Sequence, residues 1–145
     1  MTEIKIGGRT IPLTYTTYEM VAIQKEIGCT AYQLREEVFG LRQEEEDNPE
    51  SVVMDVVTDP EKAEKLGRLI SILGNAGLEE SGQEGDLTGK WVLRHMKPCL
   101  IAAYAVAALA VIVEGNTPPE SPAKENKGPV DEGLEEENAK KQPGN

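Results

Sequence analysis

The chain has few of the side chains on which catalysis and metal binding usually depend. Its 145 residues include one histidine, two cysteines and 4% aromatic residues. The histidine is His95, and the cysteines, Cys29 and Cys99, lie seventy positions apart. Zinc sites need a larger set of Cys and His ligands, and acid–base catalysis needs groups that converge. These shortages predict a protein that is not an enzyme and that requires no metal or cofactor.

Positive charge is also scarce, with 15 Lys and Arg against 26 Asp and Glu and a formal charge of −11. Such a chain repels phosphate, so nucleic acid is not an expected partner. The phosphate-binding and nucleophile sequences GxxxxGK[ST], GxGxxG and GxSxG are absent as well. Both cysteines are interpreted as buried thiols of a cytoplasmic protein, and the N-terminal residues do not resemble a secretion signal.

Long hydrophobic runs are limited to residues 99–113, fifteen residues without a charge. A bilayer requires roughly 20 such residues. Six of the fifteen are alanines, which lowers their hydrophobicity. The run therefore predicts a buried helix, and no membrane association is expected.

Apolar side chains are nearly missing from residues 116–145, which hold four of them but five of the nine prolines. This segment cannot build a core and is expected to be a disordered acidic tail or linker. Residues 1–115 carry 11 basic and 19 acidic side chains, and the tail carries 4 and 7. The fold is expected to lie in residues 1–115.

Local patterns in residues 1–115 predict a mainly α fold, with short amphipathic helices in a small bundle and an N-terminal β-hairpin. Gly7-Gly8 separates two alternating runs, residues 3–6 and 9–13, as in a tight hairpin, and Pro12 favours an edge strand. The spacing of Thr16 and Glu19 is that of a capping box and predicts a helix up to Ile27.

Further helices are predicted along the rest of the body. Thr30 and Gln33 repeat the capping pattern for a second helix through Leu41. The acidic run 44–50 is interpreted as a solvated loop rather than a cation site, and residues 51–58 fit either a strand or a helix. A third helix begins at Asp59-Pro60, with a stop at residues 75–77. A fourth carries Trp91 and is capped by Asp86 or Thr88, and Pro98 ends it and opens the alanine-rich helix.

Several segments together resemble the tail assembly chaperones of long-tailed phages and prophages of Gram-positive bacteria. The resemblance covers about residues 3–115 and is strongest at Leu69–Leu78, Asp86–Leu93 and Met96–Pro98. It implies a non-enzymatic protein of the host cytoplasm, absent from the mature virion, that keeps the tape measure protein soluble during tail-tube assembly. The tail-tube protein is a second implied partner.

Reversible helix packing would suit such a function, and the candidate contact residues are Met20, Trp91, Met96 and Tyr104, with the alanines of 102–110. Each of these positions is equally explained as core. A homo-oligomer is compatible with the same apolar stripes. The alternative function is a small acidic adaptor or regulatory protein that binds another protein through a helical face.

The family often makes a longer product by programmed ribosomal frameshifting. Lys140-Lys141 could be encoded by an A-rich slippery run just before the end of the frame. The resulting hypothesis is a −1 shift at Lys140 and Lys141, with the tail joining the body to an extension.

Overall fold

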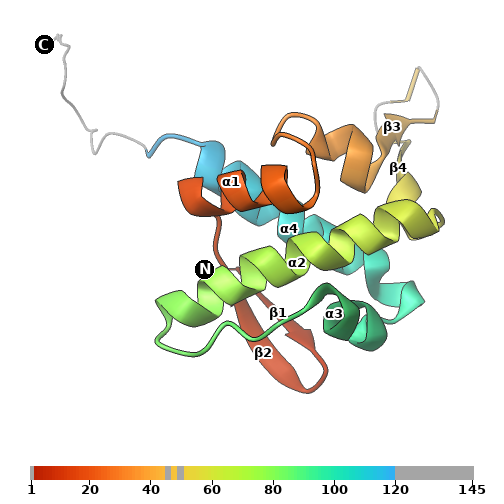
Figure 1. The fold of residues 1–145 in the computed structure, drawn as a ribbon. Helices are drawn as coiled ribbons and strands as arrows, with labels where there is room; N and C mark the ends of the chain where they lie inside the picture. Colours follow the sequence, from red (N-terminus) through yellow and green to blue (C-terminus); the bar gives the residue numbers. More distant parts are fainter. Residues whose placement is uncertain (1, 45–46, 49–50, 120–145) are drawn as a thin grey trace, which may run out of the picture.

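The computed structural model describes residues 2–44, 47–48 and 51–119, and Figure 1 shows their arrangement. One long helix, α2, runs through the middle. The helix α1 and a small second hairpin lie on one side of it, the N-terminal hairpin and α3 lie on the other, and α4 lies behind (Figure 1). The predicted mainly helical fold with an N-terminal hairpin is confirmed.

The N-terminal hairpin pairs β1 (Thr2–Ile6) with β2 (Arg9–Leu13), with Ile4 opposite Ile11. Gly7 and Gly8 have φ of 59° and 77°, a conformation that favours glycine and suits a tight hairpin turn. The alternating side chains Ile4, Ile6, Ile11 and Leu13 are buried, so the apolar face covers the core.

Helix α1 (Thr17–Glu26) follows, and its predicted capping box is present. Glu19 Oε1 accepts hydrogen bonds from the Thr16 backbone N (2.8 Å) and Oγ1 (2.6 Å). The helix gives way to Gly28, which has φ of 88°. Local sequence alone is enough to set both ends of this helix.

The predicted second helix through Leu41 is wrong over most of its length. The capping contact forms, since Thr30 N donates to Gln33 Oε1 at 2.8 Å, but only the five-residue helix η1 (Arg35–Phe39) follows. Phe39 and Val38 are fully buried, and Gly40 turns the chain with φ of 61°. The left-handed conformation of Gly40 ends the helix, and the next residues are extended.

Residues 51–58, for which the sequence left strand or helix open, contain both. β3 (Leu41–Gln43) pairs antiparallel with β4 (Val52–Met54), and the 3₁₀ helix η2 (Asp55–Val57) follows at once. The acidic loop between the two strands is only partly within the described residues, so its interpretation stays a prediction.

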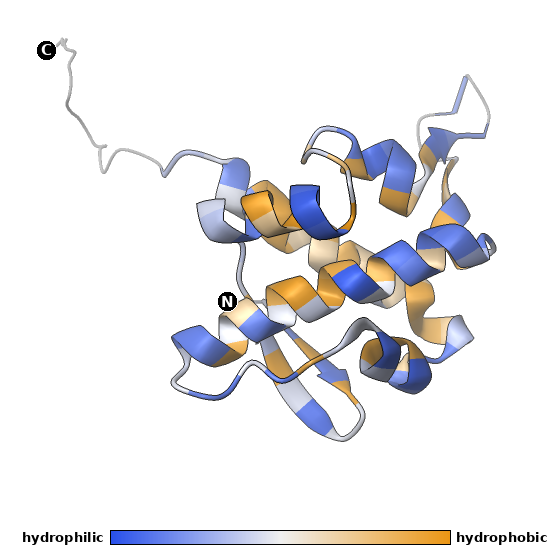
Figure 2. Ribbon diagram, in the orientation of Figure 1, coloured by the Kyte–Doolittle hydropathy of each residue, from blue (hydrophilic) through white to orange (hydrophobic). Residues whose placement is uncertain are grey.

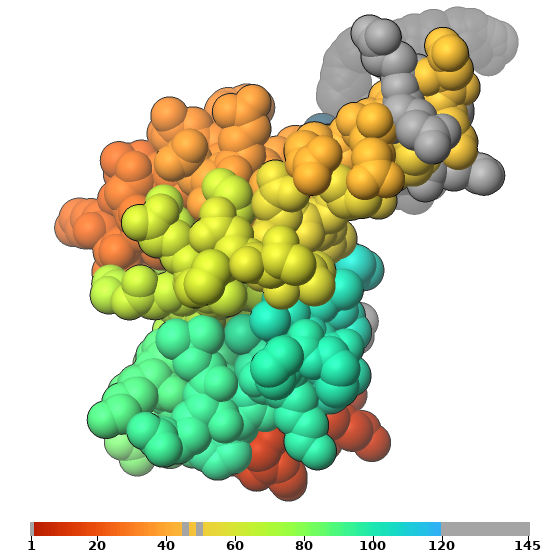
Figure 3. Space-filling view, turned by 90° about the vertical axis from the view of Figure 1, so that its right-hand side faces the viewer, coloured from red at the N-terminus to blue at the C-terminus, as the bar shows by residue number. Residues whose placement is uncertain are grey.

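Helix α2 (Pro60–Glu80) begins as predicted, with the Asp59 side chain accepting from Glu61 N and Lys62 N. The predicted stop at residues 75–77 is wrong. The helix continues to Glu80, and the chain turns at Gly82, which has φ of 82°. Figure 3 shows the first half of α2 between the segment with η1 and β3 above and α3 with the start of α4 below.

The reason lies in tertiary contacts of the two residues that signalled a stop. The Asn75 side chain donates to Leu87 O (3.0 Å) and accepts from Leu87 N (2.7 Å), so it pins the loop after α2. Gly77 lies against the backbone of Pro12, where a Cβ would overlap the carbonyl oxygen. Both residues remain helical because their contacts with Leu87 and Pro12 are part of the packed fold.

The chain then forms α3 (Gly89–His95), η3 (Pro98–Leu100) and α4 (Ile101–Asn116). Thr88 caps α3 by accepting from Trp91 N at 3.0 Å, one of the two caps that the sequence left open. Helix α4 ends one residue past the predicted boundary of the body. Most of the predicted tail, residues 120–145, lies outside the described residues. The candidate frameshift residues Lys140 and Lys141 belong to this segment.

Candidate functional site

Helix α4 has one buried face and one exposed face, and the visible part of its ribbon is mostly coloured hydrophobic (Figure 2). The chain has no charged residue between Lys97 and Glu114. The buried side packs against β1, α2 and η2, and the Tyr104 hydroxyl donates to Lys5 O at 2.7 Å. The predicted buried helix is therefore buried on one side only.

The exposed side forms the α4 outer face. Its members are small or β-branched and recur at helical spacing: Ala102, Ala103, Val106, Ala110 and Val113. The two valines are each 54% exposed. The alanines were among the predicted contact residues, whereas Val106 and Val113 were not, although their spacing with residues 102 and 110 was a usable signal. This face offers van der Waals contact without charge.

Length and composition alone would also let this region cross a membrane. One helix of the described residues passes that test, Pro98–Asn116, with a mean hydropathy of 2.0, and 33% of the window is buried inside the fold. Core helices of soluble proteins pass the same test.

The four predicted contact residues are scattered rather than gathered. Met20 is 43% exposed on α1, whereas Met96 and Tyr104 are buried in the core. Trp91 is partly buried and joins α3 to the N-terminal hairpin. These positions do not form one surface in this conformation.

Trp91 packs against Gly7 and Arg9 of the hairpin and against His95 of its own helix. A Cβ on Gly7 would lie 2.7 Å from the indole, so only glycine allows the turn this close. The Arg9 guanidinium lies 5.6 Å from the ring centroid, within cation–π range, and the His95 ring lies 4.3 Å away. His95 Nδ1 is also 2.8 Å from Trp91 O. The contacts of His95 with Trp91 are therefore those of a structural residue.

The cysteines have different environments. Cys29 is buried, as predicted, and burial raises the pKa of its thiol. Cys99 is exposed in η3, so the prediction of a second buried thiol is wrong. Cys99 lies where the chain turns into α4, and the side chains of this turn are exposed. Both thiols are free.

A groove lies along α2, on the other side of the molecule from α4. We call it the α2 groove; it has a volume of about 1000 Å³. One wall comes from α1, with Tyr18, Ala22 and Glu26, and the other from residues 87–94. Its floor is a single stripe of α2: Glu64, Arg68, Ser71, Ile72, Asn75, Ala76 and Glu79.

No sequence pattern predicted this groove, because it is formed by three segments that are distant in the chain. The sequence feature that could have indicated this site is a pair of basic residues one turn apart, Lys90 and Arg94, in a strongly acidic chain. Among the described residues, no group of three or more His, Cys, Asp or Glu side chains is placed to hold a metal ion.

Comparisons of the chain with known protein families, with characterised proteins and with solved structures give no match. Support for a function therefore comes from the surfaces themselves and from the resemblance in the sequence.

Proposed function

We propose that this protein is a phage tail assembly chaperone, which binds the tape measure protein and keeps it soluble while the tail tube assembles in the host cytoplasm. The observation that carries the proposal is the α4 outer face, an exposed and uncharged helix surface on a protein of strong negative charge. The resemblance of residues 3–115 to tail assembly chaperones supports it.

The dimensions of this face suit reversible binding. A helix of 16 residues is about 24 Å long and about 10 Å wide. One face of that size is well below the roughly 800 Å² that each partner buries in a stable complex. A client helix held by this face alone can therefore dissociate when the tail tube closes around it.

Small side chains make the face suitable for helical clients. Ala102, Ala103 and Ala110 leave room for another helix to approach closely, because the distance between packed helices depends on the side chains at the contact. Val106 and Val113 add apolar area at the edges. The acidic remainder of the protein keeps the resulting complex soluble.

The deciding experiment is co-expression with the tape measure protein of the same phage, without detergent. We expect this protein to raise the soluble yield of its client and to co-purify with it. Val106→Glu should abolish both effects, because it places a charge in the centre of the face. Val52→Glu is the matched control, since Val52 has the same 54% exposure but lies on β4.

The outcomes separate the alternatives. If wild-type protein neither co-purifies with the client nor raises its soluble yield, the proposed function is wrong. Equal behaviour of the two variants would leave the function standing and remove the α4 outer face as its site. A requirement for detergent would indicate a membrane segment. An adaptor or regulatory protein would bind another partner, and its gene would not lie beside a tape measure gene.

A further inference from the structure

The α2 groove has the dimensions of a binding site for a helix. Its floor runs along α2 from Glu64 to Glu79, sixteen residues that span about 22 Å. A helix about 10 Å wide and of that length has a volume of roughly 1700 Å³, so the groove volume of about 1000 Å³ would take about half of it, with the other half exposed.

The groove has an apolar strip, and most polar side chains of its floor are paired within the chain. The strip consists of Ile72 and Ala76 on the floor, Ala22 on the α1 wall, and Leu87 and Leu93 on the other wall. The polar side chains beside them are already used by the chain itself: Glu19 accepts from Thr16, the Ser71 hydroxyl donates to Arg68 O at 2.7 Å, and Asn75 pairs with the Leu87 backbone. The middle of the groove therefore offers a short apolar strip to a partner.

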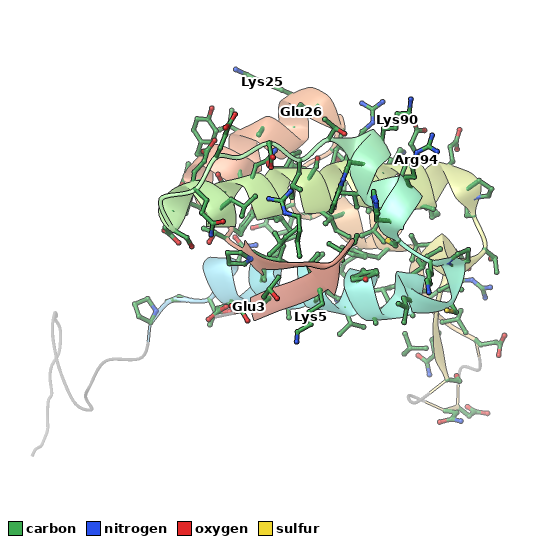
Figure 4. The ribbon with its side chains drawn as sticks, turned by 90° about the horizontal axis from the view of Figure 1, so that it is seen from below. Glu3, Lys5, Lys25, Glu26, Lys90 and Arg94 are labelled. Carbon is green, nitrogen blue, oxygen red and sulfur yellow. The ribbon has the colours of Figure 1, made fainter. Side chains whose placement is uncertain are left out.

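The two rims carry opposite charge. Lys90 and Arg94 project from α3 one turn apart, and Glu26 projects from α1 on the same side of the molecule (Figure 4). Among the ion pairs of the described residues, none includes Lys90 or Arg94, whereas Arg68 on the floor is paired with Glu64 at 3.6 Å. In a chain with 26 acidic and 15 basic side chains, two adjacent cations without acidic partners are available for an external carboxylate.

From this arrangement we propose that the α2 groove binds an amphipathic helix of a partner protein that carries carboxylates one turn apart along the edge facing Lys90 and Arg94. The apolar stripe of that helix lies on the floor, and basic side chains of its opposite edge face Glu26. Nucleic acid does not fit, because Glu26, Glu64 and Glu79 would repel its phosphates.

This site is separate from the α4 outer face, which lies on the other side of α2 (Figure 4). The inference therefore does not depend on the tape measure protein. It can fail or succeed whatever the outcome of the co-expression experiment.

The test uses the full chain and a synthetic probe. The probe is a fluorescent 15-residue helical peptide of alanine and leucine, with glutamates at i and i+4 on one edge and lysines on the other. Binding is measured by fluorescence anisotropy at about 50 mM salt, where screening is weak. We expect saturable binding that weakens several-fold at about 300 mM salt.

Charge reversal identifies the site. The double variant Lys90→Glu/Arg94→Glu should lower the affinity at least tenfold. The control Lys5→Glu/Arg35→Glu causes the same change in net charge at exposed residues away from both rims of the groove, and it should bind like wild type. A peptide with its glutamates replaced by lysines should regain affinity for the first variant. Circular dichroism checks that each variant is folded.

Two results would overturn the inference. One is absence of saturable binding of the acidic-edged peptide to the folded wild-type chain. The other is an equal loss of affinity in both double variants, which would attribute binding to net charge rather than to the groove.

Discussion

The backbone of α2 lies against that of the N-terminal hairpin at Gly77, and this contact gives a sharp prediction for Gly77→Ala. The added Cβ would overlap the Pro12 carbonyl oxygen, 2.5 Å from the carbonyl carbon and 3.1 Å from Leu13 N. All three are backbone atoms, so no change of rotamer relieves the overlap. The hairpin has to move away from the helix.

The magnitude follows from opposing contributions. Alanine is about 1 kcal/mol better than glycine inside a helix. Overpacking costs about 1–3 kcal/mol. Movement of the hairpin also weakens the hydrogen bond from Thr14 N to Leu73 O, 3.1 Å long, worth about 1 kcal/mol, and exposes part of Ile11 and Leu13. We expect a net loss of about 3 kcal/mol in the free energy of unfolding.

The matched control is Gly74→Ala, one turn earlier on α2. Its Cβ would meet Leu87 Cδ1 at 2.6 Å, at the end of a side chain that can rotate, and Ile11 Cγ2 at 3.1 Å, where a shift of a few tenths of an ångström is enough. The gain in helix propensity offsets most of that cost, so this variant should stay within about 1 kcal/mol of wild type. Urea unfolding followed by circular dichroism measures both. A Gly77→Ala protein no less stable than Gly74→Ala would refute the reasoning.

Three further predictions concern buried groups. Asn75→Ala removes both hydrogen bonds to Leu87 and should lower the free energy of unfolding by about 2 kcal/mol in the same assay; an unchanged urea midpoint would contradict this. A thiol reagent should label Cys99 at once and Cys29 only after urea unfolding, because Cys29 is buried and its pKa is raised; simultaneous labelling of both would show the burial to be wrong. Burial raises the pKa of Tyr15 above 10.0, so the unfolded state loses this proton first and stability should fall as pH rises above about 10. Tyr15→Phe should flatten that fall, and an identical pH profile would exclude Tyr15 as its source.

Sequence patterns predicted those elements whose ends depend on local chemistry. The Gly7-Gly8 turn, the Thr16 and Glu19 capping box and the Asp59 cap all involve residues within a few positions of one another, and all are present. Patterns that depend on distant contacts were misleading.

Asn75 and Gly77 show why. Judged from the local sequence, both residues favour a helix end. In the fold, the Asn75 side chain is hydrogen-bonded to the Leu87 backbone, and Gly77 leaves room for the backbone of Pro12. Neither partner can be inferred from the local sequence. The α2 groove could not be predicted for the same reason, since its walls come from separate helices. The α4 outer face was predictable in part, because an uncharged helix must have an exposed side if it packs on only one other layer.

The glycines of α2 also determine how the domain folds. Gly67, Gly74 and Gly77 are buried, and each lies close to another part of the chain. Together they cost about 3 kcal/mol of helix propensity relative to alanine, so α2 on its own should be largely unfolded in water. Its helix forms only when the N-terminal hairpin and residues 87–93 pack against it. During synthesis the hairpin and α2 leave the ribosome before that last segment, so the central helix is completed late and the domain folds as one cooperative unit.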